Sequence, residues 1–219
     1  MNTKFSKVLK HLSQTALLMV ASVITNASYA VPINPQVLLE KATKATFERI
    51  ELDQESIKSD PDHLRVIIEQ ELMPYIDHRF AAFKVLGNQF KNVPKDKIPE
   101  FVSEFKQYLV ANFGVALANY GGQEVWFEPA KDIANKSKIS IKAIIRQEEG
   151  PDIRISFKLR KNKNTGEWKT YDLEAEGISM LSSKRSEFSS IIRQQGIQAA
   201  IEIMRNTNSQ SLKIVSNGN

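Results

Sequence analysis

The middle of the chain alternates between apolar and polar residues with a period of two, which is typical of β-strands. Three runs place apolar residues on one face and mainly charged or hydroxyl residues on the other: 138–146, 153–160 and 170–176. A shorter run at 124–128 predicts one more strand. The turns between the longer runs are short, at Gly150-Pro151 and at 162–166. The pattern therefore predicts an antiparallel meander of about four strands with one buried face.

Apolar residues on both sides of these strands recur every three or four positions, as they do in amphipathic helices. Four helices are expected before the strands: 34–52, 60–73, 75–86 and 96–120. The last of these carries one continuous apolar stripe over about six turns. Two more helices are expected after the strands, with Gly196 as the break between them. This order of elements predicts an α+β fold with no second domain boundary.

The first thirty residues have the pattern of a secretion signal. Lys4, Lys7 and Lys10 give a basic start, residues 15–24 are apolar, and small residues precede a cleavage position at Ala30. The apolar run is about half of the ~20 residues that a membrane span needs. We therefore expect cleavage after Ala30 and export, with an uncleaved anchor as the alternative. The expected division is a signal peptide, one folded domain and a flexible polar tail: 1–30, 31–205 and 206–219.

Removal of this signal changes the charge of the protein. The whole chain has 30 Lys and Arg against 25 Asp and Glu. The signal contains three of the basic residues and none of the acidic ones, so the remainder carries 27 − 25 = +2. Such a nearly neutral chain lacks the basic field of a nucleic-acid-binding protein. The absence of cysteine excludes thiol catalysis and thiolate metal sites.

The sequence matches no catalytic template that we tested. Only His63 and His78 follow the signal, and their separation does not fit two metal ligands on one helix. Gly177-Ile178-Ser179 is similar to the start of a nucleophile elbow, but Leu181 stands where the closing glycine is required. No metal, cofactor or catalytic residue is therefore expected, and the protein is predicted not to be an enzyme.

Three carboxylates in the third long run share one face, at Asp172, Glu174 and Glu176. If Asn164 is the centre of the preceding hairpin, Arg154 lies opposite Glu174, and Ser156 lies opposite Asp172. Opposite charges across a strand pair are weakly stabilising, so we expect a solvated charge ladder here. On the other flank, the same reasoning places Lys142 opposite Lys158. A docking role for this basic patch remains an alternative.

The C-terminal third of the chain closely resembles the signature of a known family. The matching segments are Tyr171 to Leu181, Arg185 to Phe188, and Ile191 to Ile197. They resemble the MlaC family of periplasmic lipid carriers, also called the toluene-tolerance family, in an ungapped order of Asp-rich strand, Gly-aliphatic-Ser, basic turn, aromatic residue and helix ending at glycine. Asp60-Pro61 and Leu86-Gly87 agree more loosely. One departure is Ser183-Lys184-Arg185, where many relatives have Asn-Tyr-Arg.

This resemblance implies a curved antiparallel sheet wrapped by N- and C-terminal helices, with an apolar pocket for acyl chains between the sheet and the helices. The domain at 31–205 is then a periplasmic phospholipid carrier that shuttles lipids between the outer and inner membranes and maintains outer-membrane lipid asymmetry. The implied partners are phospholipid, an inner-membrane Mla transporter complex and an outer-membrane Mla lipoprotein–porin complex, with no nucleic acid and a monomeric protein. No cofactor is implied.

The residues expected to hold the acyl chains are apolar and come from the long helix, the strands and the segment after them: Phe105, Leu109, Phe113, Ile141, Ile155, Phe157, Leu173, Ile178 and Met180. Phe157 is expected to face Leu109 and Phe113 on the long helix. One alternative is a small-ligand-binding protein or an enzyme on a cone-shaped α+β fold, which requires a polar residue pointing into the cavity. None of the inward strand positions is charged. A second alternative is a periplasmic adaptor with a solid core.

Overall fold

The computed structural model describes residues 34–118, 120–147 and 150–213. The predicted signal at 1–30 therefore lies outside the described residues. The helices before the sheet are α2 (Pro35–Leu52), α3 (Gln54–Ser59), α4 (His63–Ile67), the π-helical η1 (Ile68–Leu72), the 3-10 helix η2 (Met73–Tyr75), α5 (His78–Leu86), the 3-10 helix η3 (Gly87–Asn92) and α6 (Lys97–Ala118). The strands are β1 (Val125–Phe127), β2 (Lys138–Ile145), β3 (Ile153–Lys161), β4 (Trp168–Ala175) and β5 (Ile178–Ser179), and α7 (Met180–Asn208) follows them.

Local sequence explains where several helices begin. The Asn34 side chain accepts a hydrogen bond from the amide of Gln36 at 2.9 Å, and Pro35 occupies the first helical position of α2. The Asp77 carboxylate accepts from the amide of Phe80 at 3.1 Å and begins α5. The helix expected from residue 60 is less regular than predicted. It begins at His63 and passes through π-helical and 3-10 turns around Pro74, which has no amide proton to continue an α-helix.

The strands form one antiparallel sheet in the order β1-β2-β3-β4-β5. The predicted meander is confirmed, and its fifth strand is β5. This strand was not predicted because its two residues are too short to show an alternating pattern. In the described residues, no helix is long and apolar enough to cross a membrane.

The predicted register between β3 and β4 is wrong by two residues. Ser156 pairs with Glu174 instead of Asp172, and a bulge interrupts the ladder between Lys158 and Leu159. Up to Lys158 the shift of two residues leaves the side chains on their expected face, so alternation alone does not detect it. Beyond the bulge the shift is one residue, and the side chains of β4 exchange faces there. Opposite charges do face each other, because the Lys158 Nζ lies 2.8 Å from the Glu174 Oε2. The partner of Arg154 is Glu176, at 2.9 Å.

The register between β2 and β3 also differs from the prediction. Ser140 lies opposite Lys158, and Lys142 lies opposite Ser156. The predicted Lys142–Lys158 pair is therefore wrong, since the two lysines are not directly opposed. The hydroxyls of Ser140 and Ser156 lie 2.7 Å apart and share a hydrogen bond.

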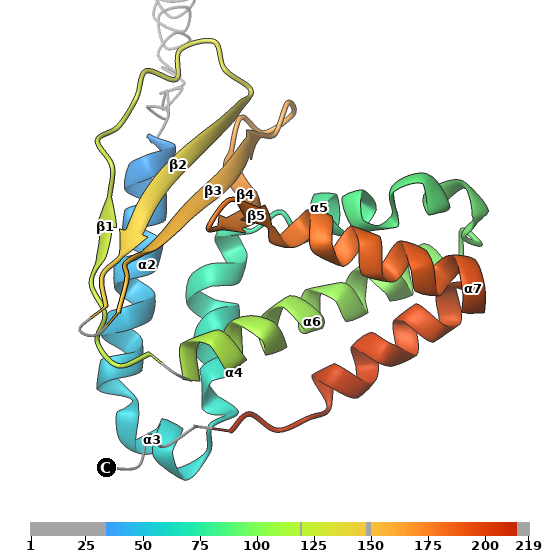
Figure 1. Cartoon of the computed structure of the whole chain (residues 1–219), viewed down its shortest axis with the longest axis horizontal. Helices are drawn as coiled ribbons and strands as arrows, with labels where there is room; N and C mark the ends of the chain where they lie inside the picture. The colour runs from blue at the N-terminus through green and yellow to red at the C-terminus, as the bar shows by residue number, and fades with distance from the viewer. Residues whose placement is uncertain (1–33, 119, 148–149, 214–219) are drawn as a thin grey trace, which may run out of the picture. The chain divides into compact units, whose positions relative to one another are not determined.

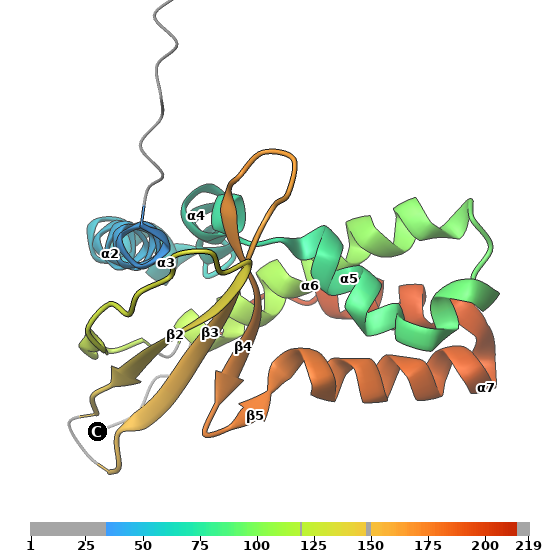
Figure 2. The same cartoon turned by 90° about the horizontal axis from the view of Figure 1, so that it is seen from above.

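The sheet and the helices make two distinct packing arrangements (Figures 1 and 2). Helix α2 lies over one face of β2 and β3, where Leu39 is buried against Ile141 and Leu159. Helices α5, α6 and α7 pack against one another around Phe101 and Phe188, which are fully buried. We call these two groups the sheet cluster and the helical cluster.

The C-terminal part of the chain contains one confirmed prediction and one wrong prediction. Gly196 has φ 83° and ψ 170°, which interrupts the helical backbone of α7 at the predicted break. The loose tail predicted from Asn206 is wrong for residues 206–213. Helix α7 continues to Asn208, and Leu212 is only 5% exposed, in a cluster with Ile57 and Leu64. A single apolar residue in a polar segment docks it, because its burial outweighs the polar composition around it.

Candidate functional site

The apolar face of the sheet is built by residues from several strands. Across it, Ile139 pairs with Leu159, Ile141 with Phe157, and Ala143 with Ile155. Leu173 continues the same face, since it lies opposite Phe157 on β4. The Phe157 ring stacks on that of Phe127, with centroids 6.1 Å apart and an interplanar angle of 26°. The face is therefore continuous, and up to the bulge between Lys158 and Leu159 it is aliphatic or aromatic.

Four residues of the sheet cluster were missed by the sequence prediction: Leu39, Phe127, Ile133 and Trp168. Trp168 has a clear cause. The bulge between Lys158 and Leu159 changes the parity of β4, so Trp168 lies opposite Lys161 and is buried in the sheet cluster at 7% exposure. The other three belong to α2, the short strand β1 and the loop after it. Of these three, only Leu39 had a signal in the sequence, which is the amphipathic pattern of α2.

The interior of the protein offers little for chemistry. Among the described residues, Thr46 is the one buried polar side chain, and its hydroxyl donates to the carbonyl of Ala42 at 2.8 Å. No three His, Asp or Glu side chains of the described segments are grouped so that they could hold a metal ion. The inward positions of the sheet are uncharged, so this face can bind apolar groups by contact but supplies no acid, base or nucleophile.

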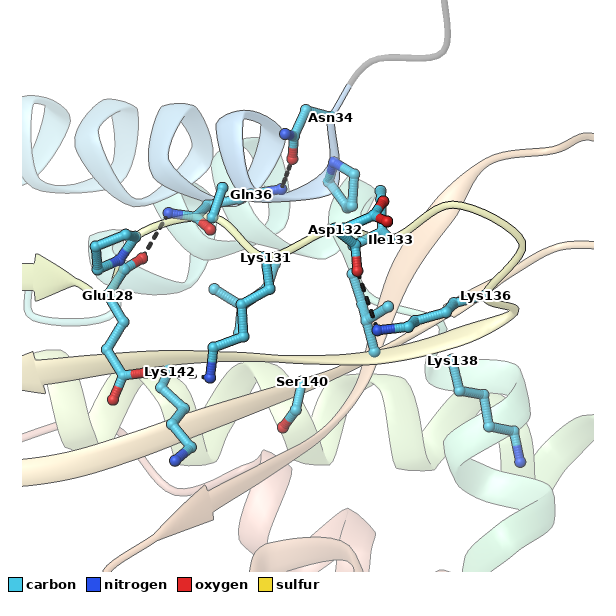
Figure 3. Close-up of a pocket in the computed structure, with 15 residues that line it drawn as sticks. Asn34, Gln36, Glu128, Lys131, Asp132, Ile133, Lys136, Lys138, Ser140 and Lys142 are labelled. Carbon is cyan, nitrogen blue, oxygen red and sulfur yellow. Dashed lines mark hydrogen bonds and ion pairs between the residues drawn. The ribbon is translucent and has the colours of Figure 1, made fainter.

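A cavity of about 260 Å³ opens beside the sheet cluster, between the start of α2, the β1–β2 loop and β2 (Figure 3). Ile133, Ile139 and Ile141 contribute its apolar lining. The loop that crosses it is held by Gln36, whose side-chain amide donates to the carbonyl of Glu128 at 2.9 Å. Lys136 donates to the carbonyl of Asp132 at 3.0 Å at the other end of the loop. The cavity thus has an apolar interior and a polar rim.

A second cavity, of about 280 Å³, is lined largely by the charged face of the sheet. Lys142, Arg154 and Lys158 line it together with Glu174. Lys158 and Glu174 form the ion pair described above, and their side chains are about a quarter exposed, at 27% and 28%. This cavity is polar. Pockets for drug-sized ligands have volumes of about 300–1,000 Å³, so each of the two cavities is smaller than such a pocket.

Ion pairs and hydrogen bonds attach the sheet to the helices. The Arg160 guanidinium bonds the Asp77 carboxylate at 2.5 Å and lies 4.2 Å from the Phe80 ring centroid. The Asp172 carboxylate accepts from the Ser179 hydroxyl at 2.7 Å and from the amide of Leu181 at 2.9 Å. Ser179 is therefore engaged in positioning the start of α7 and is not a free nucleophile. The segment around Ser179 that resembles a family motif therefore has a structural role, where β5 passes into α7.

His78 lies at the start of α5, beside this junction. Burial lowers the pKa of His78, and the positive charge of Lys106 lowers the pKa further, while Asp77 opposes both effects. The neutral imidazole is thus favoured in the folded protein. His63 belongs to a different group, because its Nε2 lies 2.7 Å from the Asp53 carboxylate, which also bonds Arg49 at 2.6 Å. Both histidines are thus held by contacts within the fold.

The structure gathers four of the residues expected to hold acyl chains on the apolar sheet face, places Ile178 at the exposed edge of that face and separates the other four. Ile141, Ile155, Phe157 and Leu173 share the apolar sheet face. The others are distributed among other surroundings: Phe105 and Leu109 in the helical cluster, Phe113 beside Ile68 and Val110, and Ile178 and Met180 at 63% and 46% exposure. The expectation that Phe157 faces Leu109 and Phe113 is wrong. Phe157 packs with Phe127 near α2 instead.

Ile178 and Met180 are exposed because β5 is an edge strand of two residues and α7 begins directly after it. A tight turn at Glu176 and Gly177, both with positive φ, returns the chain so that Ile178 pairs with Ala175 at the open edge of the apolar face. The two residues were selected from the family motif, and a motif does not report which side chains are buried. The structure thus places them outside the apolar interior.

Comparison with known proteins gives consistent matches. The family model described as MlaC protein matches residues 40–206. The chain is 33% identical over 199 residues to the intermembrane phospholipid transport system binding protein MlaC of Haemophilus influenzae, covering 90% of each protein. It is 21% identical over 164 residues to the toluene tolerance protein ttg2D of Pseudomonas putida, covering 74% of each.

A solved structure has the same fold. It is a phospholipid-binding protein from Ralstonia solanacearum in complex with a phospholipid, with a TM-score of 0.71 and 17% sequence identity, and the match covers 81% of this chain and 98% of that one. At this identity the likeness is evidence for the fold alone. The family model and the Haemophilus relative both span most of the sequence, and on that basis this chain belongs to the MlaC family.

Proposed function

We propose that this protein binds phospholipid and carries it through the periplasm between the outer and inner membranes, which maintains outer-membrane lipid asymmetry. The observation that carries the proposal is the uncharged apolar face of the sheet, with Ile141, Ile155, Phe157 and Leu173 side by side, in a member of the MlaC family. A carrier of this kind performs no reaction.

The energetics explain why a carrier is needed. An acyl chain of about fifteen methylenes gains on the order of 12 kcal/mol on leaving water, at ~0.8 kcal/mol per methylene, before ordering costs are subtracted. A free lipid therefore crosses an aqueous compartment extremely slowly. An apolar face inside a soluble protein removes this barrier without any specific chemistry toward the headgroup.

Lipid entry requires movement of the protein. The cavities of about 260 and 280 Å³ beside β2 are too small for a diacyl lipid. We infer that α2 and the β1–β2 loop, which the Gln36–Glu128 hydrogen bond joins, move away from β2 when a chain enters, because the first cavity lies between them and β2. Phe157 and Leu173 are only half-buried, so they retain surface for an acyl chain to cover.

The remaining parts of the proposal follow from family membership and from the sequence. Export follows from the signal pattern at 1–30, with cleavage after Ala30. The donor and acceptor of lipid are an inner-membrane Mla transporter complex and an outer-membrane Mla lipoprotein–porin complex. The protein acts as a monomer.

The test is to purify the protein, extract it with organic solvent and identify the extract by mass spectrometry. We expect close to one diacyl phospholipid per protein, and a lipid-stripped sample is expected to reload from phospholipid vesicles. A preparation that contains no lipid and does not reload would contradict the proposal and would favour an adaptor with a solid core. Recovery of a small polar molecule would favour the alternative of a small-ligand-binding protein or enzyme.

A matched pair of variants sharpens this test. Ile141→Asp places a charge on the apolar face, where Ile141 is 6% exposed, and is expected to abolish lipid retention. Leu52→Asp makes the same kind of change at a residue that is 81% exposed, and is expected to retain lipid. Circular dichroism of both variants separates loss of lipid from loss of fold. If Ile141→Asp, Ile155→Asp and Leu173→Asp all unfold, and none of them loses lipid while keeping its fold, these residues form a packed core.

A further inference from the structure

An aromatic pair is exposed where α5 passes into η3. The Phe90 side chain is 43% exposed, and its ring lies perpendicular to that of Phe83, with centroids 5.5 Å apart and an interplanar angle of 89°. Phe83 itself packs against the helical cluster. The exposed ring therefore packs on one that is partly buried. A single exposed apolar residue is ordinary on a protein surface, so the inference depends on the charges around it.

Cations surround this pair. The Arg79 guanidinium carbon lies 5.5 Å from the Phe83 ring centroid. Lys91 follows Phe90 directly, and Lys95 lies in the exposed segment that leads to α6. Arg185, from α7, lies across the backbone of Gly87. These six residues form the Phe90 patch: Arg79, Phe83, Phe90, Lys91, Lys95 and Arg185.

The four cations of the patch differ from other cations near them. Lys97, Lys184 and Arg205 each lie within 3.1 Å of a glutamate. Within the part of the chain that the structure describes, Arg79, Lys91, Lys95 and Arg185 have no carboxylate in ion-pair range. Asp96, exposed beside Lys95, offsets part of this charge, and four cations against one carboxylate still leave the patch net positive.

Arg185 lies against the backbone of Gly87. A Cβ atom at Gly87 would lie 2.6 Å from the Arg185 Nε, so the absence of a side chain there leaves room for the guanidinium. Gly87 also has φ 49°, a conformation that glycine adopts without strain. Arg185 is itself exposed, so an anion outside the protein can reach its guanidinium.

An occupant of the Phe90 patch has to offer negative charge and a region that accepts an aromatic ring. The surface of an anionic phospholipid membrane offers both, because lipid phosphates attract Lys and Arg while aromatic rings settle at the headgroup level. We propose that the Phe90 patch docks the protein on the surface of an anionic phospholipid membrane. This goes beyond the proposed carriage of lipid, since the patch is formed by α5, η3 and α7 and not by the sheet (Figure 1).

The test is co-sedimentation of the full mature chain with vesicles. We expect binding to vesicles of equal parts phosphatidylglycerol and phosphatidylcholine, little binding to pure phosphatidylcholine, and loss of binding at 1 M salt, where the Debye length falls to about 3 Å. Each cation near an anionic surface contributes about 1 kcal/mol, or about fivefold in affinity. Lys91→Gln and Arg185→Gln are therefore expected to weaken binding about fivefold each, and Phe90→Ser is expected to weaken it as well.

Two matched controls test whether the patch is responsible. Lys163→Gln removes an exposed charge in the β3–β4 turn, and Leu52→Ser removes an exposed apolar side chain from α2. Both are expected to bind vesicles as the unmodified protein does. All variants are expected to retain extracted lipid unchanged, so failure of the docking proposal is distinguishable from failure of the carrier proposal.

Three results would overturn the docking proposal. The first is equal binding to neutral and anionic vesicles. The second is no binding to anionic vesicles at low salt, or binding that the patch variants and the controls weaken to the same extent. The third is that a soluble polyglutamate peptide releases the protein from the vesicles while Phe90→Ser leaves vesicle binding unchanged. That result would assign the patch to an acidic protein segment instead of a membrane.

Discussion

Replacement of Phe157 and of Phe101 by alanine separates a lipid-binding face from a packed core. Phe101 is 0% exposed in the helical cluster, with the rings of Phe105 and Phe188 at centroid distances of 6.2 and 6.3 Å. Phe157 is half-buried and has Phe127 as its one ring neighbour. The two phenylalanines therefore have the same chemistry in different surroundings, which makes each the control for the other.

The expected losses differ between the two sites. Truncation of a fully packed phenylalanine costs about 3–5 kcal/mol, so Phe101→Ala is expected to lower the free energy of unfolding by that amount. Phe157→Ala is expected to cost about half as much in lipid-free protein, because part of its surface is already in water. An aromatic side chain buries about 200 Å² in full. If an acyl chain covers about a third of that on Phe157, then at ~25 cal/mol per Å² the contact is worth about 1.7 kcal/mol, or about 20-fold in affinity.

The assay is urea unfolding of both variants in lipid-stripped and lipid-loaded form, with extracted lipid measured by mass spectrometry. A bound ligand stabilises the folded state in proportion to the logarithm of its affinity. Loading is therefore expected to stabilise Phe101→Ala as much as the unmodified protein, and to stabilise Phe157→Ala less. Equal losses for both variants, with equal lipid retention, would show that Phe157 is an ordinary core residue and would refute this reasoning.

Three further predictions concern stability. Lys158→Glu is expected to lower the free energy of unfolding by about 0.5–1 kcal/mol, and the double change with Glu174→Lys is expected to recover it, as measured by a double-mutant cycle in urea; no recovery would contradict the observed register. Leu212→Ala is expected to cost about 2–4 kcal/mol because Leu212 is 5% exposed, whereas a loose tail would give no change in urea unfolding. Burial lowers the pKa of His78, so the unfolded chain binds a proton more readily. Stability is therefore expected to fall as the pH drops below about 6.5, and His78→Gln is expected to reduce that fall in thermal melts between pH 7 and 5; an unchanged pH dependence would contradict it.

The elements of the fold were predictable because they depend on local patterns. The period of two in β2, β3 and β4 survives any change of register, so the meander was predicted correctly. Gly196 was recognised as a break because its conformation is one that other residues rarely adopt. The register was not predictable, since it depends on a bulge at Lys158/Leu159 that no pattern in the sequence marks.

The candidate site was predictable only where it consists of strands. Ile141, Ile155, Phe157 and Leu173 lie together because alternation alone places them on one face. The helical members of the prediction failed for a different reason. An apolar stripe on α6 predicts that its residues are buried, but not which neighbour buries them, and Phe105 packs against α7 rather than the sheet. Which neighbour buries a helical residue depends on contacts between residues far apart in the chain.

The docking of Leu212 has a consequence for the order in which the chain can fold. Its amide bonds the Asp62 carboxylate at 3.1 Å, and its side chain covers Gly114 and the cluster of Ile57 and Leu64. During synthesis from the N-terminus, these aliphatic residues therefore stay exposed to solvent until Leu212 is made, about 150 positions after Asp62. During that interval the helices are an exposed target for holding chaperones and for proteases. A fusion partner placed directly after residue 213 would compete with this closure, whereas one joined through a flexible spacer would leave the leucine free to seat.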